Sequence, residues 1–198
     1  MTRIAATSAP LHPLLSERWS PRGFDPAHQL TGPQLTALLE AARWSPSANN
    51  SQPWRFVATR RGEPAFDRLA GTLRDTNARW AGSASALLLV LAETVDRAGA
   101  PRWYGLYDTG QAVAHLVTQA QAEGLSAHQM GGFDKAAAAA EFGIDPRFTP
   151  VVVVAVGRWH TADLPADLAE REAAPRVRRP LEELVLPADP PVCLQRTA

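Results

Sequence analysis

The residues best suited to chemistry lie in one loop, Pro46-Ser47-Ala48-Asn49-Asn50-Ser51-Gln52-Pro53-Trp54. Pro53 offers no N–H and pushes the preceding Gln52 out of helical geometry, so the loop should be stiff. Its hydroxyl and amide side chains donate and accept hydrogen bonds without carrying charge, which suits recognition of a planar heterocycle better than proton abstraction. Asn, Ser and Pro are also ordinary in a connector between a helix and a strand, and composition alone favours that plainer interpretation.

Basic residues gather at both ends of the chain. In Arg18-Trp19-Ser20-Pro21-Arg22, two arginines flank a hydroxyl, an arrangement that suits a phosphate or a carbonyl edge. Near the C-terminus, Arg176 and Arg178 are two residues apart, so in an extended segment their side chains would point the same way. Taken alone, either group is more typical of a solvated charged surface.

Taken together, the N-terminal motif and the loop resemble those of the nitroreductase family of FMN-dependent oxidoreductases. Members of that family typically open with Arg-x-Ser-x-Arg/Lys and carry a Pro-Ser-x-x-Asn-x-Gln-Pro-Trp loop about one helix later. Order and spacing both agree here, and the resemblance continues to the C-terminal arginines, so it covers nearly the whole chain. It implies a tightly bound FMN, NAD(P)H as electron donor, and an intertwined homodimer with two FMN molecules at its interface.

The resemblance implies a role for each residue of the first motif. Arg18 and Ser20, with Trp19 between them, would hold the phosphate end of FMN or the ribityl chain near it. Arg22 would contact the pyrimidine edge of the ring. It would tune the flavin there, because a cation stabilises the anionic reduced form.

The resemblance also assigns the C-terminal arginines and the loop. The FMN phosphate carries nearly two negative charges, so more cations are expected, and Arg176, Arg178 and Arg179 supply them. Of these, Arg176 and Arg178 match two basic residues of the family that grip the phosphate. Gln52 and Trp54 would shape the loop through backbone bonds and packing. Four loop residues would face the FMN of the partner subunit: Pro46, Ser47, Ala48 and Asn50.

Further matching positions lie in the middle of the chain. Gly131 and Gly132, after Met130, match a place where backbone N–H groups approach the flavin ring edge, although glycines can also serve only a turn. Asn77 matches an asparagine near the carbonyl edge of the ring. Trp80 departs from the pattern, since some family members have a lysine there.

Composition predicts one domain over residues 1–198, with residues 1–13 loosely ordered. The resemblance makes residues 160–198 an extension that carries the phosphate-binding arginines. Twenty basic and twenty acidic residues cancel, so no global field recruits nucleic acid or a membrane. The single cysteine, Cys193, excludes an internal disulfide framework and argues against a thiolate metal site. Without a membrane-spanning apolar run or a secretory signal, a cytoplasmic location is expected.

Other chemistries lack their motifs. None of the five histidines forms an i, i+4 pair with a glutamate between, so no metal site is expected. The patterns of Rossmann dinucleotide sites, Walker phosphate loops and nucleophile elbows are also missing. A nicotinamide donor would therefore bind over the flavin.

Periodicity and caps predict the elements that position these motifs. Thr31 should cap a helix that ends before Pro46, with Gln34 completing a capping box. Asp108 should cap the longest helix, and Gly124 should end it. Further helices are expected at 14–19, 66–73 and 134–142, and strands at 54–59, 86–92 and 151–156.

Helices that alternate with few strands indicate an α+β fold with helices on both faces of a sheet. The resemblance implies a nitroreductase-like three-layer sandwich with a mostly antiparallel central sheet flanked by helices. In that fold the long central helix forms the core of the dimer.

The expected function is transfer of a hydride from NAD(P)H through FMN to a small planar acceptor, such as a nitroaromatic or a quinone, with ping-pong kinetics. No residue beyond the tuning Arg22 is assigned a catalytic role, since the cofactor does the chemistry. Many family members cover the substrate with a long helical insertion. Here the short segment 93–106 replaces it, with Arg102, Trp103 and Tyr104 as candidate contacts. Two alternatives stay open: FMN storage, delivery or sensing without turnover, and reduction of another conjugated substrate.

Overall fold

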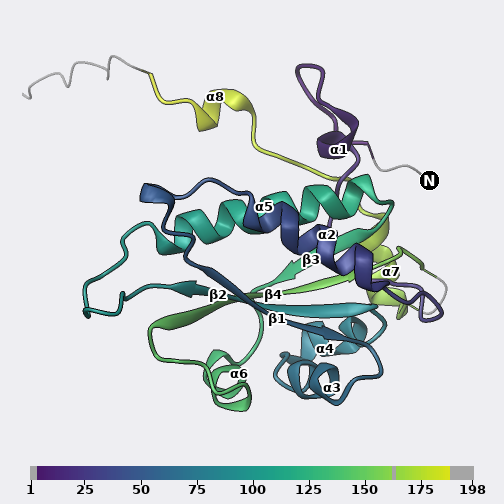
Figure 1. Ribbon diagram of the computed structural model, residues 1–198. Helices are drawn as coiled ribbons and strands as arrows, with labels where there is room; N and C mark the ends of the chain where they lie inside the picture. The colour runs from purple at the N-terminus through teal and green to yellow at the C-terminus, as the bar shows by residue number, and fades with distance from the viewer. Residues whose placement is uncertain (1–3, 162–163, 188–198) are drawn as a thin grey trace, which may run out of the picture.

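The computed structural model describes residues 4–161 and 164–187, and Cys193 lies outside them. A four-stranded sheet lies at the centre, in the order β1-β2-β4-β3, and all its neighbouring strands are antiparallel (Figure 1). The strands are β1 (Trp54–Arg60), β2 (Ala86–Glu93), β3 (Ser126–Met130) and β4 (Phe148–Gly157). The antiparallel sheet expected from the sequence is confirmed.

The central strand β2 is apolar over residues 86–92, and both of its faces are covered. Every residue of this strand is buried, as that apolar run predicts, and the burial includes Glu93 at its end. Successive side chains point to opposite faces of the sheet, so Leu87 and Leu89 join one hydrophobic cluster while Leu88 and Val90 join the other. Each buried leucine contributes roughly 1.5–3 kcal/mol relative to an exposed one. The strand therefore ties the two halves of the core together.

Helices cover both faces of the sheet, which makes the fold a three-layer α+β sandwich (Figure 1). On one face α2 (Gly32–Arg43) packs against α5 (Gly105–Ala122), and both contribute to the cluster that contains Leu88. The other face carries three short helices, α3 (Pro64–Ala70), α4 (Asp75–Ala81) and α6 (Lys135–Glu141). The predicted sandwich is confirmed.

The remaining helical segments are short: α1 (Pro13–Ser16), the single turn Ala48–Asn50, α7 (Ala166–Ala173) and α8 (Leu181–Leu184). Figure 1 shows α8 standing away from the sheet. Over residues 4–161 and 164–187, no helix combines the length and the apolar character needed to span a bilayer.

Local signals fix the start of α2 and the end of α5 as predicted. Thr31 and Gln34 form a capping box, in which Gln34 N donates to Thr31 Oγ1 at 3.3 Å and Thr31 N donates to Gln34 Oε1 at 3.1 Å. Past the end of α5, Gly124 adopts a φ of +69°. Leu125 N then donates to Ala120 O at 2.9 Å, so the helix closes with a Schellman motif.

Three expectations about the elements were wrong. Asp108 does not cap α5, because the helix begins at Gly105 with Tyr104 in the cap position and Asp108 lies buried in the first turn. The helix predicted for 66–73 stops at Ala70. The helix predicted for 14–19 is shortened to α1. In addition, α4 and β3 were not foreseen.

Candidate cofactor site

Segments from the two ends of the chain meet at a pocket of about 350 Å³, called here the arginine pocket. The residues that line it are Arg18, Trp19, Ser20, Arg22, Arg171, Ala174, Pro175, Arg176, Val177 and Arg178. Every residue that the resemblance assigned to the phosphate end of FMN therefore lies in one place. Arg179, the next arginine along the chain, is not part of this lining.

Positive charge is concentrated in the arginine pocket. Burial lowers the pKa of Arg18, and the nearby charges of Arg176 and Arg178 lower it further. Like charges held together repel one another, and a bound anion relieves that repulsion. Guanidinium groups also bind phosphate in bidentate fashion, and the hydroxyl of Ser20 lies 3.4 Å from Arg18 Nη1. These residues fit the phosphate of FMN.

Arg176 fastens the C-terminal segment to the N-terminal one. Its Nη1 donates to Ser16 O at 2.9 Å, and its Nη2 donates to Arg18 O at 2.7 Å. Arg178 makes no such link to the N-terminal segment, since its Nη1 donates to the neighbouring Val177 O at 2.8 Å. The two arginines therefore differ: Arg176 shapes the pocket, and Arg178 presents an exposed guanidinium to it.

Glu172 determines where Arg22 lies. This buried residue of α7 accepts a hydrogen bond from Arg22 N at 2.8 Å, and its carboxylate lies 3.8 Å from Arg22 Nη1. The ion pair offsets part of the charge of Arg22, so a ring beside that side chain would feel less than a full cation. Glu172 was not foreseen from the sequence. The available signal was its position four residues after the buried Leu168, which puts both on one face of α7.

Asn77 and the glycine pair, which the resemblance assigned to two places on the flavin ring, lie together. Asn77 Nδ2 donates to Gly132 O at 2.9 Å. A Cβ on Gly132 would lie only 2.9 Å from the same Nδ2, whereas a Cβ on Gly131 would meet nothing within 4 Å. The backbone at Gly131 is therefore open to a ligand. The side chain of Met130 is 2% exposed within the core, so only its backbone could contact a cofactor.

Trp80 is a core residue, and its indole supplies no charge to the site. Its ring packs against Phe24, with centroids 6.2 Å apart, and against His128, with centroids 4.6 Å apart. His128 Nδ1 lies 2.8 Å from Pro21 O, and burial lowers its pKa to about 4. The neutral ring thus donates to Pro21 and supports the segment between Arg18 and Arg22.

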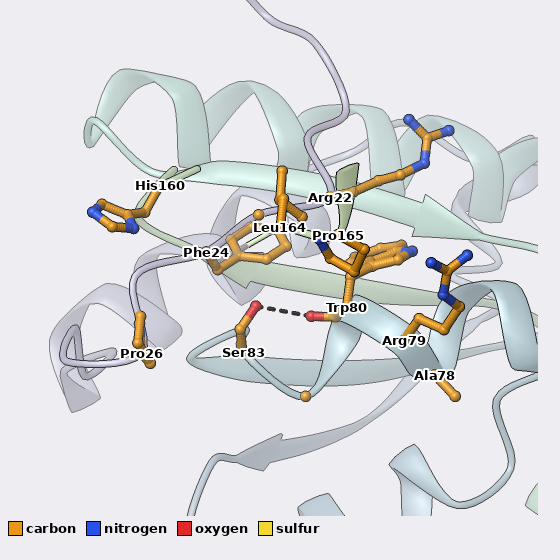
Figure 2. A pocket seen from close by; sticks show the side chains of 12 residues that line it. Arg22, Phe24, Pro26, Ala78, Arg79, Trp80, Ser83, His160, Leu164 and Pro165 are labelled. Atoms are coloured by element: carbon orange, nitrogen blue, oxygen red, sulfur yellow. Dashed lines mark hydrogen bonds between the residues drawn. The ribbon is translucent and has the colours of Figure 1, made fainter. Parts of the chain in front are cut away.

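A second pocket, of about 220 Å³, adjoins this support (Figure 2). Phe24 and Trp80 lie in its interior, with Arg79 at one side and His160 at the other. Arg22 lines both pockets, so the two are neighbours.

The loop 46–52 contributes to neither of these pockets. Asn49 and Asn50 are exposed, and both have a φ of +53°. Gln52 shapes the loop from within, since its N donates to Ser47 Oγ at 3.0 Å and its Nε2 donates to Asn50 O at 3.2 Å. Within one chain, the loop is not joined to the arginine pocket.

A metal centre has no support in the described part of the chain. There, no three His, Cys, Asp or Glu side chains come together as a possible set of metal ligands.

Comparison with known proteins places this geometry in a family. The sequence matches the Nitroreductase family model over residues 15–79 and 62–158. An uncharacterized 15.4 kDa protein of Mycolicibacterium smegmatis is 39% identical over 141 residues, which is 66% of this chain and 92% of that protein. An oxygen-insensitive NAD(P)H nitroreductase of Salmonella typhimurium is 27% identical over 209 residues, 84% of this chain and 94% of the relative.

A solved structure is similar over nearly the whole length. The crystal structure of an oxidoreductase containing FMN has a TM-score of 0.88 and 35% identity, over 93% of this chain and 95% of that one. The family match spans more than half of the sequence, and it agrees with the sandwich fold. The chain belongs to the nitroreductase family.

Proposed function

We propose that the chain is an FMN-dependent oxidoreductase that passes a hydride from NAD(P)H through the flavin to a small planar acceptor in ping-pong fashion. Family membership and a relative named as an NAD(P)H nitroreductase identify an NAD(P)H-dependent oxidoreductase. The similar structure that contains FMN identifies the cofactor. The observation that carries the proposal is the arginine pocket, in which cations from both ends of the chain converge.

Each residue of the site acts by binding or orienting. Arg18, Ser20 and Arg178 bind the phosphate, while Arg22 places a partly compensated charge near the ring. The open backbone at Gly131 faces the ring edge. When bound, FMN supplies the chemistry, since it accepts a hydride from one molecule and gives it to another. The protein therefore contributes orientation and charge.

A second copy of the chain completes the site in this proposal. The loop 46–52 does not line the arginine pocket of its own chain, which leaves it available to the FMN of a partner. Large apolar side chains are also exposed around the start of α5 and along the C-terminal segment, including Trp103, Tyr107, Leu181 and Leu186. In this proposal these side chains are covered by the second copy.

The acceptor is a flat conjugated compound in this proposal. Trp103 and Tyr104 are exposed at the start of α5, close in the chain to Asp108, which contacts the loop at Ala48. Aromatic side chains favour stacking against planar molecules. Nitroaromatics and quinones are therefore the first compounds to assay.

Anaerobic mixing with NADH and with NADPH tests the enzyme. The purified protein should be yellow, and its visible flavin band should bleach rapidly with at least one donor. A second addition, of a nitroaromatic or a quinone, should restore the band. A yellow protein that stays oxidised with both donors would instead indicate storage, delivery or sensing of FMN.

Two neighbouring arginines give a matched test of the phosphate assignment. Arg178→Ala should weaken FMN binding about tenfold to a hundredfold, the loss expected for one charge-assisted contact. Arg179→Ala removes the same charge one residue away, outside the pocket lining, and should leave FMN binding unchanged. Equal effects of the two substitutions would contradict the assignment.

A further inference from the structure

The loop 46–52 is held in a conformation that its residues do not prefer. Three of its residues, Asn49, Asn50 and Gln52, have φ values of +53°, +53° and +47°, and none of them is glycine. Left-handed backbone is disfavoured for L-residues, although asparagine tolerates it better than most. Such backbone persists only where surrounding contacts over-determine it, and it clusters at functional sites.

Asp108 anchors this loop from outside. The side chain is 3% exposed and lies in the first turn of α5, where the helix dipole favours negative charge. Its Oδ2 accepts a hydrogen bond from Ala48 N at 3.0 Å, and its Oδ1 lies 3.4 Å from Gln111 Nε2. No described cation forms a salt bridge with it, so the backbone N–H of Ala48 is a main partner of a buried carboxylate.

The anchor acts where the strained turn begins. Ala48 is the first residue of the single helical turn, directly before Asn49 and Asn50. At the other end of the loop, Arg55 Nη1 donates to Gln52 O at 3.0 Å. The bonds inside the loop set its internal shape, but the Asp108 bond alone among those described here fixes its start to the long helix.

We infer that Asp108 is a positioning residue, which holds the loop 46–52 ready to contact the cofactor. The inference rests on the proposed function for the claim that this loop contacts FMN. The carboxylate touches neither cofactor nor substrate, and it acts through the backbone of Ala48.

Two substitutions remove the same hydrogen bond from opposite sides. Asp108→Ala removes the acceptor. Ala48→Pro removes the donor at a first helical position, which tolerates proline, and the preceding Ser47 is already extended at φ −149° and ψ 153°. Asp108→Asn keeps an oxygen acceptor without the charge and serves as the conservative rescue. Asp96→Ala is the matched control, because Asp96 holds the N–H groups of Ala98 and Ala100 in a different turn.

The affinity of each variant for FMN is measured by quenching of flavin fluorescence, and the stability of the cofactor-free protein is measured separately by thermal unfolding. Asp108→Ala and Ala48→Pro should each weaken binding about tenfold to a hundredfold, and Asp108→Asn should recover most of the loss. The double variant should bind FMN as tightly as whichever single variant has the lower affinity, because both substitutions remove the same hydrogen bond. Asp96→Ala should bind like the wild type.

The outcomes separate this inference from the proposed function. Binding of FMN by Asp108→Ala within about twofold of wild type, or losses that multiply in the double variant, would overturn the inference while leaving the function intact. Lower thermal stability with unchanged affinity would also overturn it, since that describes a purely structural residue. If the wild type binds no FMN, the proposed function fails. In that case, amide hydrogen exchange at residues 47–52 tests whether Asp108 anchors the loop. Anchoring predicts faster exchange in Asp108→Ala than in the wild type, and unchanged exchange overturns the inference. Should Asp108→Ala fail to fold, Ala48→Pro and Asp108→Asn carry the same test.

Discussion

His128 makes the support of the cofactor site sensitive to acid. Its ring lies beneath the N-terminal motif, with Nδ1 2.8 Å from Pro21 O. Burial lowers its pKa from 6.5 to about 4, and the charges of Arg22 and Arg18 act in the same direction. The folded protein therefore keeps this residue neutral at pH values where the unfolded chain has already bound a proton.

The size of the effect follows from that difference in pKa. Above pH 6.5 neither state is protonated at His128, so the residue adds no pH dependence to the free energy of unfolding. Between pH 6.5 and 4 the unfolded state holds one more proton, and stability falls by about 1.4 kcal/mol per pH unit. The loss is complete near pH 4. Between pH 6.5 and 5 it amounts to about 2 kcal/mol.

Urea unfolding of the cofactor-free protein at pH 7 and pH 5 measures this loss. The comparison is with His128→Asn, whose amide can still donate to Pro21 O but does not titrate. The variant loses the ring packing on Trp80 at both pH values, so this loss cancels when the free energies of unfolding at the two pH values are subtracted. The other titrating groups are the same in the wild type and the variant, so their contributions cancel when the two proteins are compared. The wild type should lose about 2 kcal/mol more than the variant between the two pH values. The same loss in both proteins would refute the reasoning.

Two further predictions concern the ring end of the site. Gly131→Ala should weaken FMN binding in a fluorescence titration, because its Cβ meets no protein atom within 4 Å and would extend into the space that the proposal gives to the flavin ring, whereas Gly132→Ala would press only on the end of the Asn77 side chain, with Nδ2 2.9 Å from the new Cβ, and should be milder. An equal response of the two glycines would contradict that assignment. Glu172→Gln keeps an acceptor for Arg22 N but removes the negative charge 3.8 Å from the guanidinium. The midpoint potential of the bound flavin should rise, and an unchanged potential would show that Arg22 does not act on the ring.

The helices could be predicted where a local signal determines them. Thr31 and Gln34 satisfy each other's hydrogen-bonding groups within one turn. Gly124 adopts the left-handed backbone that ends α5, which glycine does without the steric cost of a side chain. The strand β2 was equally clear, because a short run with no polar side chain suits a strand buried on both faces. In each case the information lies within a few neighbouring residues.

The features that were not foreseen depend on contacts between residues that are far apart in the sequence. The strand β3 reads Ser-Ala-His-Gln-Met, which has little β-propensity of its own, and it is held by pairing with the valine-rich β4. Asp108 looked like a cap because aspartate often occupies that position. Only the fold brings Ala48, sixty residues earlier, to its carboxylate.

The residues of the candidate site also differ in whether the sequence alone could reveal them. The resemblance assigned Arg18, Ser20 and Arg178 to one ligand from motifs at both ends of the chain, and the structure brings the three residues to one pocket. Glu172 could not be found in this way, because it lies 150 residues from Arg22 and its neighbourhood resembles an ordinary charged helix. The packing of Trp80 was hidden for the same reason, since its partners lie in separate segments.

The central claim is that the arginine pocket binds the phosphate of FMN. Titration of the cofactor-free protein with FMN and with riboflavin, which lacks only the phosphate, tests it most directly. FMN should bind on the order of a hundredfold more tightly than riboflavin. Added salt should reduce this ratio of affinities, because the contact with the phosphate is ionic. Equal affinity for the two flavins, at low and at high salt, would contradict the account.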